Sequence, residues 1–158
     1  MKKTVIGLPR EGALISITEN FAVTAKSYVT VPVQYNAFIY VDDVSTYRLG
    51  PCTERSLSAK FGRDLIGHQV KVAFVHWKNI ENTYWRIEDY RPNEKLYPNL
   101  FMNAEGSLQS EIVNYPRLIS VFGEKTTITE EDIKNKISLA VTNIISPILA
   151  EKHNVSFS

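Results

Sequence analysis

The side chains of this chain of 158 residues offer few arrangements that could perform chemistry. His68 follows Asp64 by four residues, a spacing that suits a general base and the carboxylate that orients it. Asp42 and Asp43 are adjacent, and paired carboxylates are hard oxygen ligands for a cation. No serine nucleophile motif accompanies His68, and no further ligands follow the two aspartates at the spacing of a calcium loop. We therefore interpret the first pair as a solvated loop and the second as turn residues.

The remaining candidates are single residues. His76 stands beside Trp77 in an expected strand, which is more typical of a core or interface histidine than of a metal ligand. His153 belongs to the end of an expected helix. Cys52 has no neighbouring histidine that would activate a thiolate, and a single cysteine excludes an intrachain disulfide and a cysteine-based zinc site. These residue types predict no catalytic, cofactor-binding or metal site, and they fit a reducing compartment such as the cytoplasm.

The composition is that of an ordinary globular protein, with 44% hydrophobic and 22% charged residues. It excludes disordered and collagen-like classes. Eighteen Lys and Arg residues stand against seventeen Asp and Glu residues, so the formal net charge is +1. A charge this small gathers no polyanion non-specifically, and we expect no nucleic-acid partner.

One stretch has a local excess of positive charge. Its basic residues are Arg48, Arg55, Lys60 and Arg63. We interpret them as a solvated surface, with contact to anionic lipid headgroups as the functional alternative. Pro9 and Arg10 interrupt the N-terminal apolar stretch too early for a signal peptide, and no window reaches the ~18 to 20 apolar residues that span a bilayer. We therefore expect a cytoplasmic protein whose membrane contact, if it has any, is peripheral and on the inner face.

A period of two dominates residues 13–108, which predicts strands half-buried against a core. Residues 15–17 and 21–23 are predicted as two short strands of a hairpin. Residues 29–41 are predicted as one strand, with Pro32 at an edge or a bulge because it has no amide hydrogen. A valine-rich strand is predicted at residues 70–77.

Two antiparallel strands are expected to follow. Residues 79–82 are predicted as a turn, a strand follows from Thr83, and residues 91–94 are predicted as a second turn. The next strand has the longest alternation in the sequence, with one polar face and Gly106 as the expected site of a bulge. Its apolar face consists of Leu96, Leu100, Met102, Ala104 and Leu108.

Two helices are expected in the last third of the chain. Pro116 near its start and Gly123 after its end predict a short helix. Thr129 is the expected N-cap of a long helix, which runs from Glu130 to about Lys152. The apolar stripe of the long helix consists of Ile133, Ile137, Val141, Ile144 and Ile148. We expect this stripe to seat the helix on the sheet or to contact another copy of the chain.

Together these elements predict an α+β fold, in which a short helix and a long C-terminal amphipathic helix pack on a mixed, mainly antiparallel sheet. One domain over residues 1–158 is expected. Residues 155–157 begin a new apolar alternation, and we therefore expect the chain to be cut from a longer one.

Several short motifs follow one another in an order shared with a known group of proteins. A strand with an alanine-aromatic pair, residues 36–41, leads to a Gly-Pro turn in residues 50–57, and residues 70–77 match the next valine-rich strand. A strand with a glycine leads to a proline at a helix start in residues 106–116, and a threonine-capped helix from Thr129 follows. In this order the chain resembles the SPFH or band 7-like group of stomatin, prohibitin and flotillin, and is closest to its bacterial virion core protein-like branch.

The resemblance covers residues 28–152 and has two departures. Cys52 stands where the group has the second glycine of its turn, and a non-glycine residue resists a positive φ. The long coiled coil expected after the domain is missing from this sequence.

The resemblance implies a membrane-associated scaffold or adaptor without catalysis by this domain. It implies a homo-oligomer in the full-length protein, contacts with other proteins and no cofactor. The alternative from the residues themselves is a small-ligand or nucleic-acid-binding module, in which Tyr84 and Tyr97 belong to an aromatic-faced sheet. A hydrolase built on the pair of Asp64 and His68 ranks third.

Overall fold

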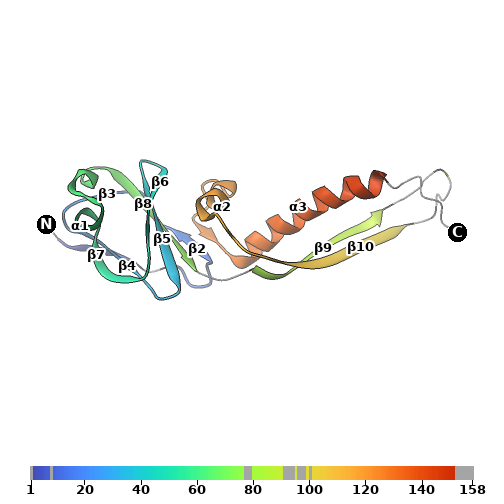
Figure 1. Cartoon of the computed structure of the whole chain (residues 1–158), viewed down its shortest axis with the longest axis horizontal. Helices are drawn as coiled ribbons and strands as arrows, with labels where there is room; N and C mark the ends of the chain where they lie inside the picture. The colour runs from blue at the N-terminus through green and yellow to red at the C-terminus, as the bar shows by residue number, and fades with distance from the viewer. Residues whose placement is uncertain are drawn as a thin grey trace. The chain divides into compact units, whose positions relative to one another are not determined.

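The computed structural model describes residues 2–7, 9–76, 80–90, 95, 99 and 101–151. Its fold is α+β, as the sequence predicts, with mixed and antiparallel sheets and a long C-terminal helix packed on strands. Contacts gather the chain into two compact units (Figure 1). Unit 1 comprises residues 1–78 and 112–129, and unit 2 comprises residues 79–111 and 130–158. The sequence predicts one domain over residues 1–158, and the structure divides this range into two compact units.

Unit 1 contains two sheets. The larger sheet has the strand order β11-β2-β8-β5-β6, and β3 also pairs with β8. Its strands are β2 (Ile15–Ile17), β3 (Phe21–Ala22), β5 (Tyr35–Val41), β6 (Val44–Leu49), β8 (Gln69–His76) and β11 (Thr127–Ile128). In the smaller sheet, β4 (Ser27–Val31) lies between β1 (Thr4–Ile6), which is parallel to it, and β7 (Cys52–Ser56), which is antiparallel. The mixture of parallel and antiparallel pairs agrees with the predicted mixed sheet.

The hydrophobic core of unit 1 collects alternate side chains of both sheets. Its buried members include Val29, Val31, Ala37, Ile39, Val72 and Phe74. The other face of β5 is covered as well, because Phe38 contacts Tyr115 of helix α2 (Tyr115–Val121) with 5.8 Å between the ring centroids. Burial on both faces explains the continuous apolar run of residues 37–41.

The short helix predicted after Pro116 is α2. The Asn114 side chain caps it, because its Oδ1 accepts a hydrogen bond from the backbone N–H of Arg117 at 3.0 Å. Gly123 follows the helix with φ 62, a left-handed conformation that glycine adopts without strain.

The predicted hairpin of residues 15–17 and 21–23 is wrong. β2 and β3 each pair with β8 and not with each other. Thr18 explains the difference, because its backbone N–H donates to the carbonyl of Val72 at 3.0 Å and its Oγ1 accepts from the Val72 N–H at 2.9 Å. These bonds keep the chain running along β8 between the two short strands.

The predicted single strand of residues 29–41 is also wrong, because the chain changes sheets within it. β4 ends at Val31, Gln34 has a left-handed φ of 71, and the N–H of Tyr35 donates to the carbonyl of Pro32 at 3.1 Å. Pro32 cannot donate to a neighbouring strand, so it marks the point where one ladder ends.

The predicted turn at Asp42 and Asp43 is confirmed. Both residues have positive φ, 48 and 66, which is the backbone of a tight hairpin turn between β5 and β6. Aspartate tolerates this conformation better than most residues. The polar segment that follows β6 forms β7, helix α1 (Leu57–Phe61) and the 3-10 helix η1 (Arg63–Leu65).

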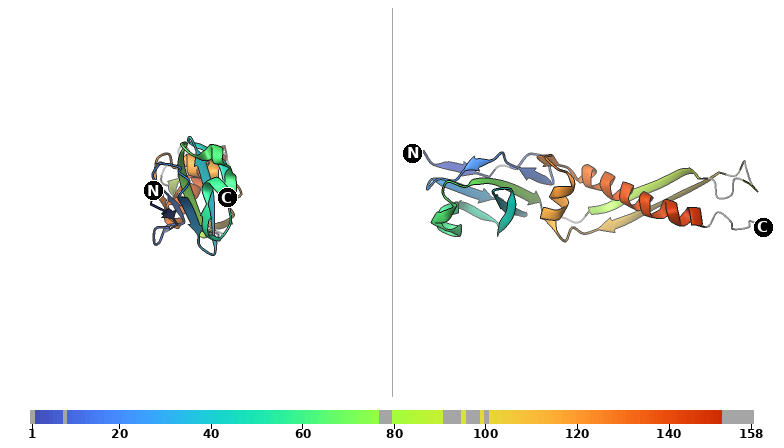
Figure 2. Two further views of the ribbon diagram at one scale, coloured as in Figure 1. Left: turned by 90° about the vertical axis from the view of Figure 1, so that its left-hand side faces the viewer. Right: turned by 90° about the horizontal axis from the view of Figure 1, so that it is seen from above.

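Unit 2 consists of a two-stranded ribbon and one helix. β9 (Ile80–Tyr90) and β10 (Met102–Ser110) are antiparallel, and helix α3 (Glu130–Glu151) packs against β9 (Figure 2). The predicted turn at residues 79–82 is wrong for the described residues 80–82, because pairing with β10 holds them extended. The predicted turn at residues 91–94 lies outside the described residues.

The predicted alternation of the ribbon is confirmed for the residues that the structure describes. Thr83 is buried and Trp85 half-buried on the inner face, whereas Tyr84 and Arg86 are exposed on the outer face. On β10, Ala104 and Leu108 are half-buried and their neighbours are exposed. Leu96 and Leu100 lie outside the described residues.

Gly106 does not form the predicted bulge. It pairs in regular register with Trp85, and the irregularities lie between Met102 and Ala104 and between Leu108 and Ser110. A Cβ atom at Gly106 would lie 2.7 Å from Cζ2 of the Trp85 indole. The glycine is therefore needed because the tryptophan ring lies directly over it, the arrangement known as aromatic rescue of a strand glycine.

The apolar stripe of α3 divides along the helix. Ile133 is 1% exposed, and Ile137 and Val141 are half-buried, but Ile144 is 63% exposed and Ile148 50% exposed. The half-buried position of the next turn is Ile145. Successive residues four apart move about 40° around a helix, so a ridge at this spacing winds around α3 as the twisted ribbon requires. The prediction that Ile144 and Ile148 seat the helix is wrong for this reason.

The division of the stripe predicts unequal stability effects. Ile133→Ala should lower the free energy of unfolding by ~2 to 5 kcal/mol, because it leaves a cavity at a buried position. Ile144→Ala is the matched control on the same helix and should change it by less than about 0.5 kcal/mol. Urea denaturation followed by circular dichroism at low protein concentration measures both. Equal losses for the two variants would contradict the packing described above.

The contact of Gly106 with Trp85 predicts a coupled pair. Gly106→Ala should lower the free energy of unfolding by ~1 to 3 kcal/mol, because the new methyl group displaces the indole. The same substitution in a Trp85→Val background should cost much less, since the obstructing ring is absent. A double-mutant cycle by denaturation gives the coupling energy. A coupling energy near zero would show that the ring does not depend on the glycine.

Candidate functional site

The structure does not bring together the predicted pair of Asp64 and His68. His68 Nδ1 lies 2.8 Å from Oδ2 of Asp42, at the hairpin turn between β5 and β6. The backbone N–H of Asp42 donates to the carbonyl of Gln69, which holds the turn beside the start of β8. Both side chains are about half-exposed, and a surface pair of this kind contributes little to stability. The orienting role considered for Asp64 is therefore wrong.

The two adjacent aspartates diverge from each other. Asp42 faces His68, and Asp43 Oδ1 lies 3.6 Å from Nζ of Lys71. Within the described part of the chain, no three His, Cys, Asp or Glu side chains are grouped so that they could hold a metal ion. Lys71 also lies over the ring of Tyr40, and burial raises the pKa of the Tyr40 phenol.

His76 and Cys52 both lie against residues of a neighbouring strand. The His76 ring packs edge-on against Tyr35, its partner across the strands, with 4.9 Å between centroids. Cys52 is half-buried, and its Sγ lies 3.8 Å from the carbonyl oxygen of Val29. Cys52 needs no positive φ, which occurs instead at Glu54 with φ 42. A cysteine in place of the second glycine therefore causes no backbone strain.

The predicted basic cluster is divided by the large sheet. The Arg48 guanidinium lies 5.6 Å from the ring centroid of Phe38. Its neighbour Tyr47 points to the other face of β6 and stacks on Phe61 of α1, with 4.3 Å between centroids. Arg48 thus lies on the face away from α1.

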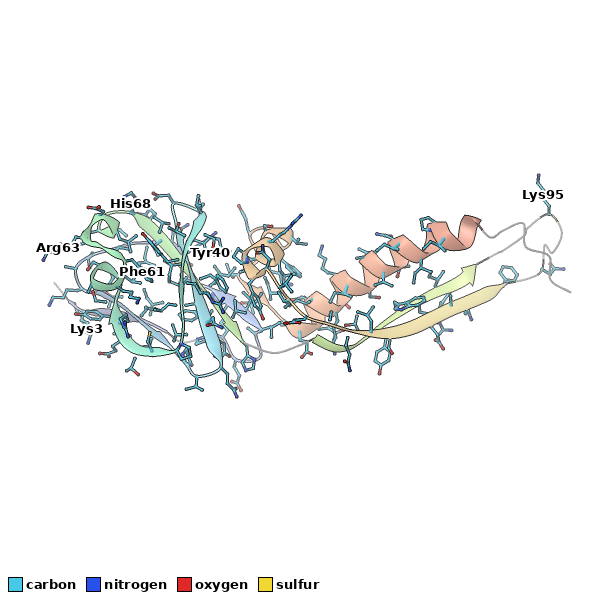
Figure 3. The ribbon with its side chains drawn as sticks, in the orientation of Figure 1. Lys3, Tyr40, Phe61, Arg63, His68 and Lys95 are labelled. Carbon is cyan, nitrogen blue, oxygen red and sulfur yellow. The ribbon has the colours of Figure 1, made fainter. Side chains whose placement is uncertain are left out.

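The three remaining basic residues stay close together in the chain. Lys60 belongs to α1, Arg63 to η1 and Arg55 to the preceding strand β7, and all three are exposed. Figure 3 shows Arg63 and Lys3 on the side of unit 1 that carries α1. Lys3 pairs with Glu54, and the hydrogen bond to this carboxylate raises the pKa of Lys3. Among the helices of the described chain, none has the length and apolarity needed to cross a bilayer.

Arg10 serves a structural purpose that the sequence did not suggest. Its Nη1 donates to the carbonyl of Ile17 at 3.2 Å and to that of Thr126 at 2.9 Å. Its backbone N–H donates to Oγ of Ser16 at 2.9 Å. These bonds tie the N-terminal segment to the ends of β2 and β11. A small cavity of about 190 Å³ lies beside Arg10.

The most unusual surface of the described chain is the solvent-facing side of α3. Between Lys136 and Glu151 the helix has no charged residue. Ala140, Ile144 and Ile148 are four residues apart and all exposed, and we call these three residues the outer ridge. The sequence predicted two of them as packing or contact residues, and the structure leaves both uncovered by this chain.

Unit 2 has a second candidate surface, which lies beside α3. α3 packs along β9. A cavity of about 620 Å³ lies beside it, and we call this cavity the β10 groove. Its lining consists of Tyr84, Trp85, Arg86, Glu105, Gly106, Ser107 and Ser138. Arg86 on its rim lies 3.1 Å from Glu88 and 4.0 Å from Glu105, Nε to carboxylate oxygen.

The sequence analysis missed the β10 groove. The sequence analysis assigned Gly106 to a bulge, whereas in the structure it pairs with Trp85 and both residues line the groove. A glycine within a regular alternation beside a tryptophan is the signal that could have indicated this site. This pattern does not predict that α3 packs along β9.

The outer face of the ribbon does not favour nucleic acid. Tyr84 is 71% exposed there, but the adjacent Arg86 is paired with two glutamates, so this face has no excess of positive charge. Tyr97, the other tyrosine of the predicted aromatic face, lies outside the described residues.

Comparisons of this chain with models of protein families, with curated proteins and with solved structures found no match.

Proposed function

We propose that this protein is a non-enzymatic scaffold or adaptor of the SPFH or band 7-like type that its sequence resembles. It acts by binding further copies of itself and other proteins at the cytoplasmic surface of a membrane. The observation that carries the proposal is the outer ridge, an uncharged apolar strip on a helix that already has a packed face.

The energetic argument concerns the two isoleucines of the ridge. Full burial of an isoleucine side chain stabilises by ~1.5 to 3 kcal/mol relative to exposure, and this chain leaves Ile144 and Ile148 largely in water. Isolated exposed apolar residues are ordinary on protein surfaces. A continuous strip without charges is different, because the solvent side of a surface helix is normally polar. Such a strip supports a role as a contact surface.

The ridge alone supports a weak contact. Three side chains bury much less than the ~1,200 Å² at which stable interfaces begin. We therefore expect copies of this chain to exchange between monomers and small oligomers at micromolar concentration, which suits a scaffold whose assembly is strengthened elsewhere in a longer protein.

Membrane contact is assigned to Arg55, Lys60 and Arg63. Each basic residue near an anionic surface contributes about 1 kcal/mol, so three of them provide weak, peripheral and salt-sensitive binding. Arg48 is excluded from this set because it lies on the other face of the large sheet.

A small-ligand-binding module is the second candidate. The β10 groove favours it, because a cavity of about 620 Å³ beside a tryptophan is large enough for a small molecule. The two charged residues of its lining, Arg86 and Glu105, lie 4.0 Å apart, Nε to carboxylate oxygen, and so partly satisfy each other. We therefore rank the scaffold first.

The scaffold proposal predicts an association that depends on the outer ridge. Size-exclusion chromatography with light scattering should show the mass rising with concentration, and Ile144→Lys should raise the dissociation constant about tenfold or more. A lysine there would have to bury its charge in the contact. Val44→Lys is the matched control, since Val44 is an equally exposed apolar residue of unit 1. A wild-type chain that stays monomeric at every accessible concentration would refute self-association.

The membrane assignment predicts a difference between basic residues. Vesicles with anionic lipids should bind the chain weakly, and the double variant Lys60→Gln, Arg63→Gln should reduce this binding several-fold. Arg48→Gln, on the other face of the sheet, should leave it unchanged. Flotation at low and high salt measures all three. Tight, salt-independent binding to neutral vesicles, or an equal loss with Arg48→Gln, would oppose the assignment.

A further inference from the structure

The cavity beside Arg10, which we call the Arg10 cavity, lies within unit 1 and has both polar and apolar walls. Its volume is about 190 Å³. The polar side chains of its lining are Arg10, Ser16 and Thr18, and the apolar lining includes Ile6 and Phe74. Among the described residues that line it, none is acidic. The cavity therefore places a cation and two hydroxyl groups around a space that has no carboxylate of its own.

Arg10 uses only part of its guanidinium to hold the backbone. Its Nη1 donates to the carbonyls of Ile17 and Thr126, and these two bonds account for both hydrogens of Nη1. The edge formed by Nε and Nη2 has no partner among the described residues. A guanidinium edge binds a carboxylate through two parallel hydrogen bonds. Because the carbonyls already hold the side chain, binding at this edge costs little further ordering.

The two hydroxyl groups are also set to donate. Ser16 is 4% exposed, and its Oγ accepts from the backbone N–H of Arg10 at 2.9 Å. Thr18 Oγ1 accepts from the backbone N–H of Val72 at 2.9 Å. Neither hydroxyl donates to an acceptor in the described part of the chain. Since buried polar groups normally have hydrogen-bond partners, both hydroxyls are suited to an acceptor that enters the cavity.

The apolar wall limits what can enter. Phe74 is the partner of Ser16 across β2 and β8, so their side chains lie on the same face of the large sheet. Phe74 is buried and Ile6 half-buried. At about 30 Å³ for a group the size of water, the cavity has room for about six non-hydrogen atoms. An occupant of this size has an anionic end at Arg10 and a short apolar end at Phe74.

From these features we infer that the Arg10 cavity binds a small carboxylate with a short apolar tail, such as butyrate. The carboxylate accepts hydrogen bonds from the Nε and Nη2 edge of Arg10 and from the hydroxyls of Ser16 and Thr18. The tail packs on Phe74 and Ile6. The inference goes beyond the proposed scaffold function and does not rest on it, because the cavity belongs to unit 1 and the outer ridge to unit 2.

Inorganic phosphate is the principal alternative, since the same donors suit its oxygens. It fits the cavity less well for two reasons. An oxygen directed at Phe74 and Ile6 would lose its water without gaining a hydrogen bond. A phosphate with two negative charges would also meet only one cationic side chain of the lining, Arg10.

Titration of the wild-type chain, followed by ¹H–¹⁵N NMR, tests the inference. Butyrate should bind with a dissociation constant of about 1 mM or below, which is within reach of six non-hydrogen atoms. It should move the amide signals of Ser16 and Thr18 and shift the Nε–H signal of Arg10. Butyramide, the uncharged probe with the same number of non-hydrogen atoms, should bind at least tenfold more weakly. Phosphate and a short peptide with a C-terminal valine are titrated in parallel, and both should bind more weakly than butyrate.

Substitutions test the individual donors. Arg10→Lys keeps the charge but loses the two-pronged edge, and it should weaken butyrate binding about tenfold or more. Ser16→Ala should weaken it about five- to tenfold. Arg63→Gln is the matched control, because Arg63 is an exposed arginine of the same unit, and it should leave the dissociation constant unchanged. A variant that loses its circular dichroism spectrum is set aside, because the comparison of butyrate with butyramide in the wild type decides without any substitution.

Several outcomes would overturn the inference. Absence of butyrate binding, equal binding of butyramide, or signal shifts confined to unit 2 would show that the Arg10 cavity does not recognise a carboxylate. Tighter binding of phosphate would make it an inorganic oxyanion site, and tighter binding of the peptide would assign it to a chain terminus. Association through the outer ridge is measured separately by light scattering, so none of these results decides the proposed function.

Discussion

The proposed role depends on how α3 packs on the ribbon of β9 and β10. α3 can follow β9 only along a ridge of residues four apart, which winds about 40° around the helix at each step. Ile133, Ile137, Val141 and Ile145 lie on that ridge and are buried or half-buried. A row of side chains that runs parallel to the helix axis diverges from this ridge after two turns. Ile144 and Ile148 belong to such a row and therefore remain exposed.

The inner face of the ribbon has a second cover besides α3. The helix packs along β9, and the Trp85 ring lies over β10 at Gly106. Gly106 permits this because any side chain there would meet the indole. The Trp85 ring and α3 thus cover the inner face of the ribbon together.

Local patterns predicted the elements of the chain better than their partners. The alternation of apolar and polar residues identified β8 and the two faces of β9 and β10, and the acidic residues after Thr129 identified the start of α3. Each of these signals lies within a few residues of the chain. The hairpin of residues 15–17 and 21–23, the pair of Asp64 and His68 and the cluster with Arg48 were all inferred from closeness in sequence. In the structure, β8 binds both short strands, Asp42 from another hairpin meets His68, and β6 turns Arg48 away from α1. These outcomes depend on long-range pairing, which no local pattern encodes.

Unit 1 and unit 2 differ in how completely each one buries its apolar residues. Unit 1 encloses a core between two sheets and covers the other face of β5 with α2. Its candidate catalytic residue His68 forms an ordinary surface pair with Asp42. Unit 2 packs one side of α3 on the ribbon and leaves Ile144 and Ile148 largely in water. A contact that covers these two isoleucines would link the stability of the unit to assembly, because binding to the folded form adds to its stability.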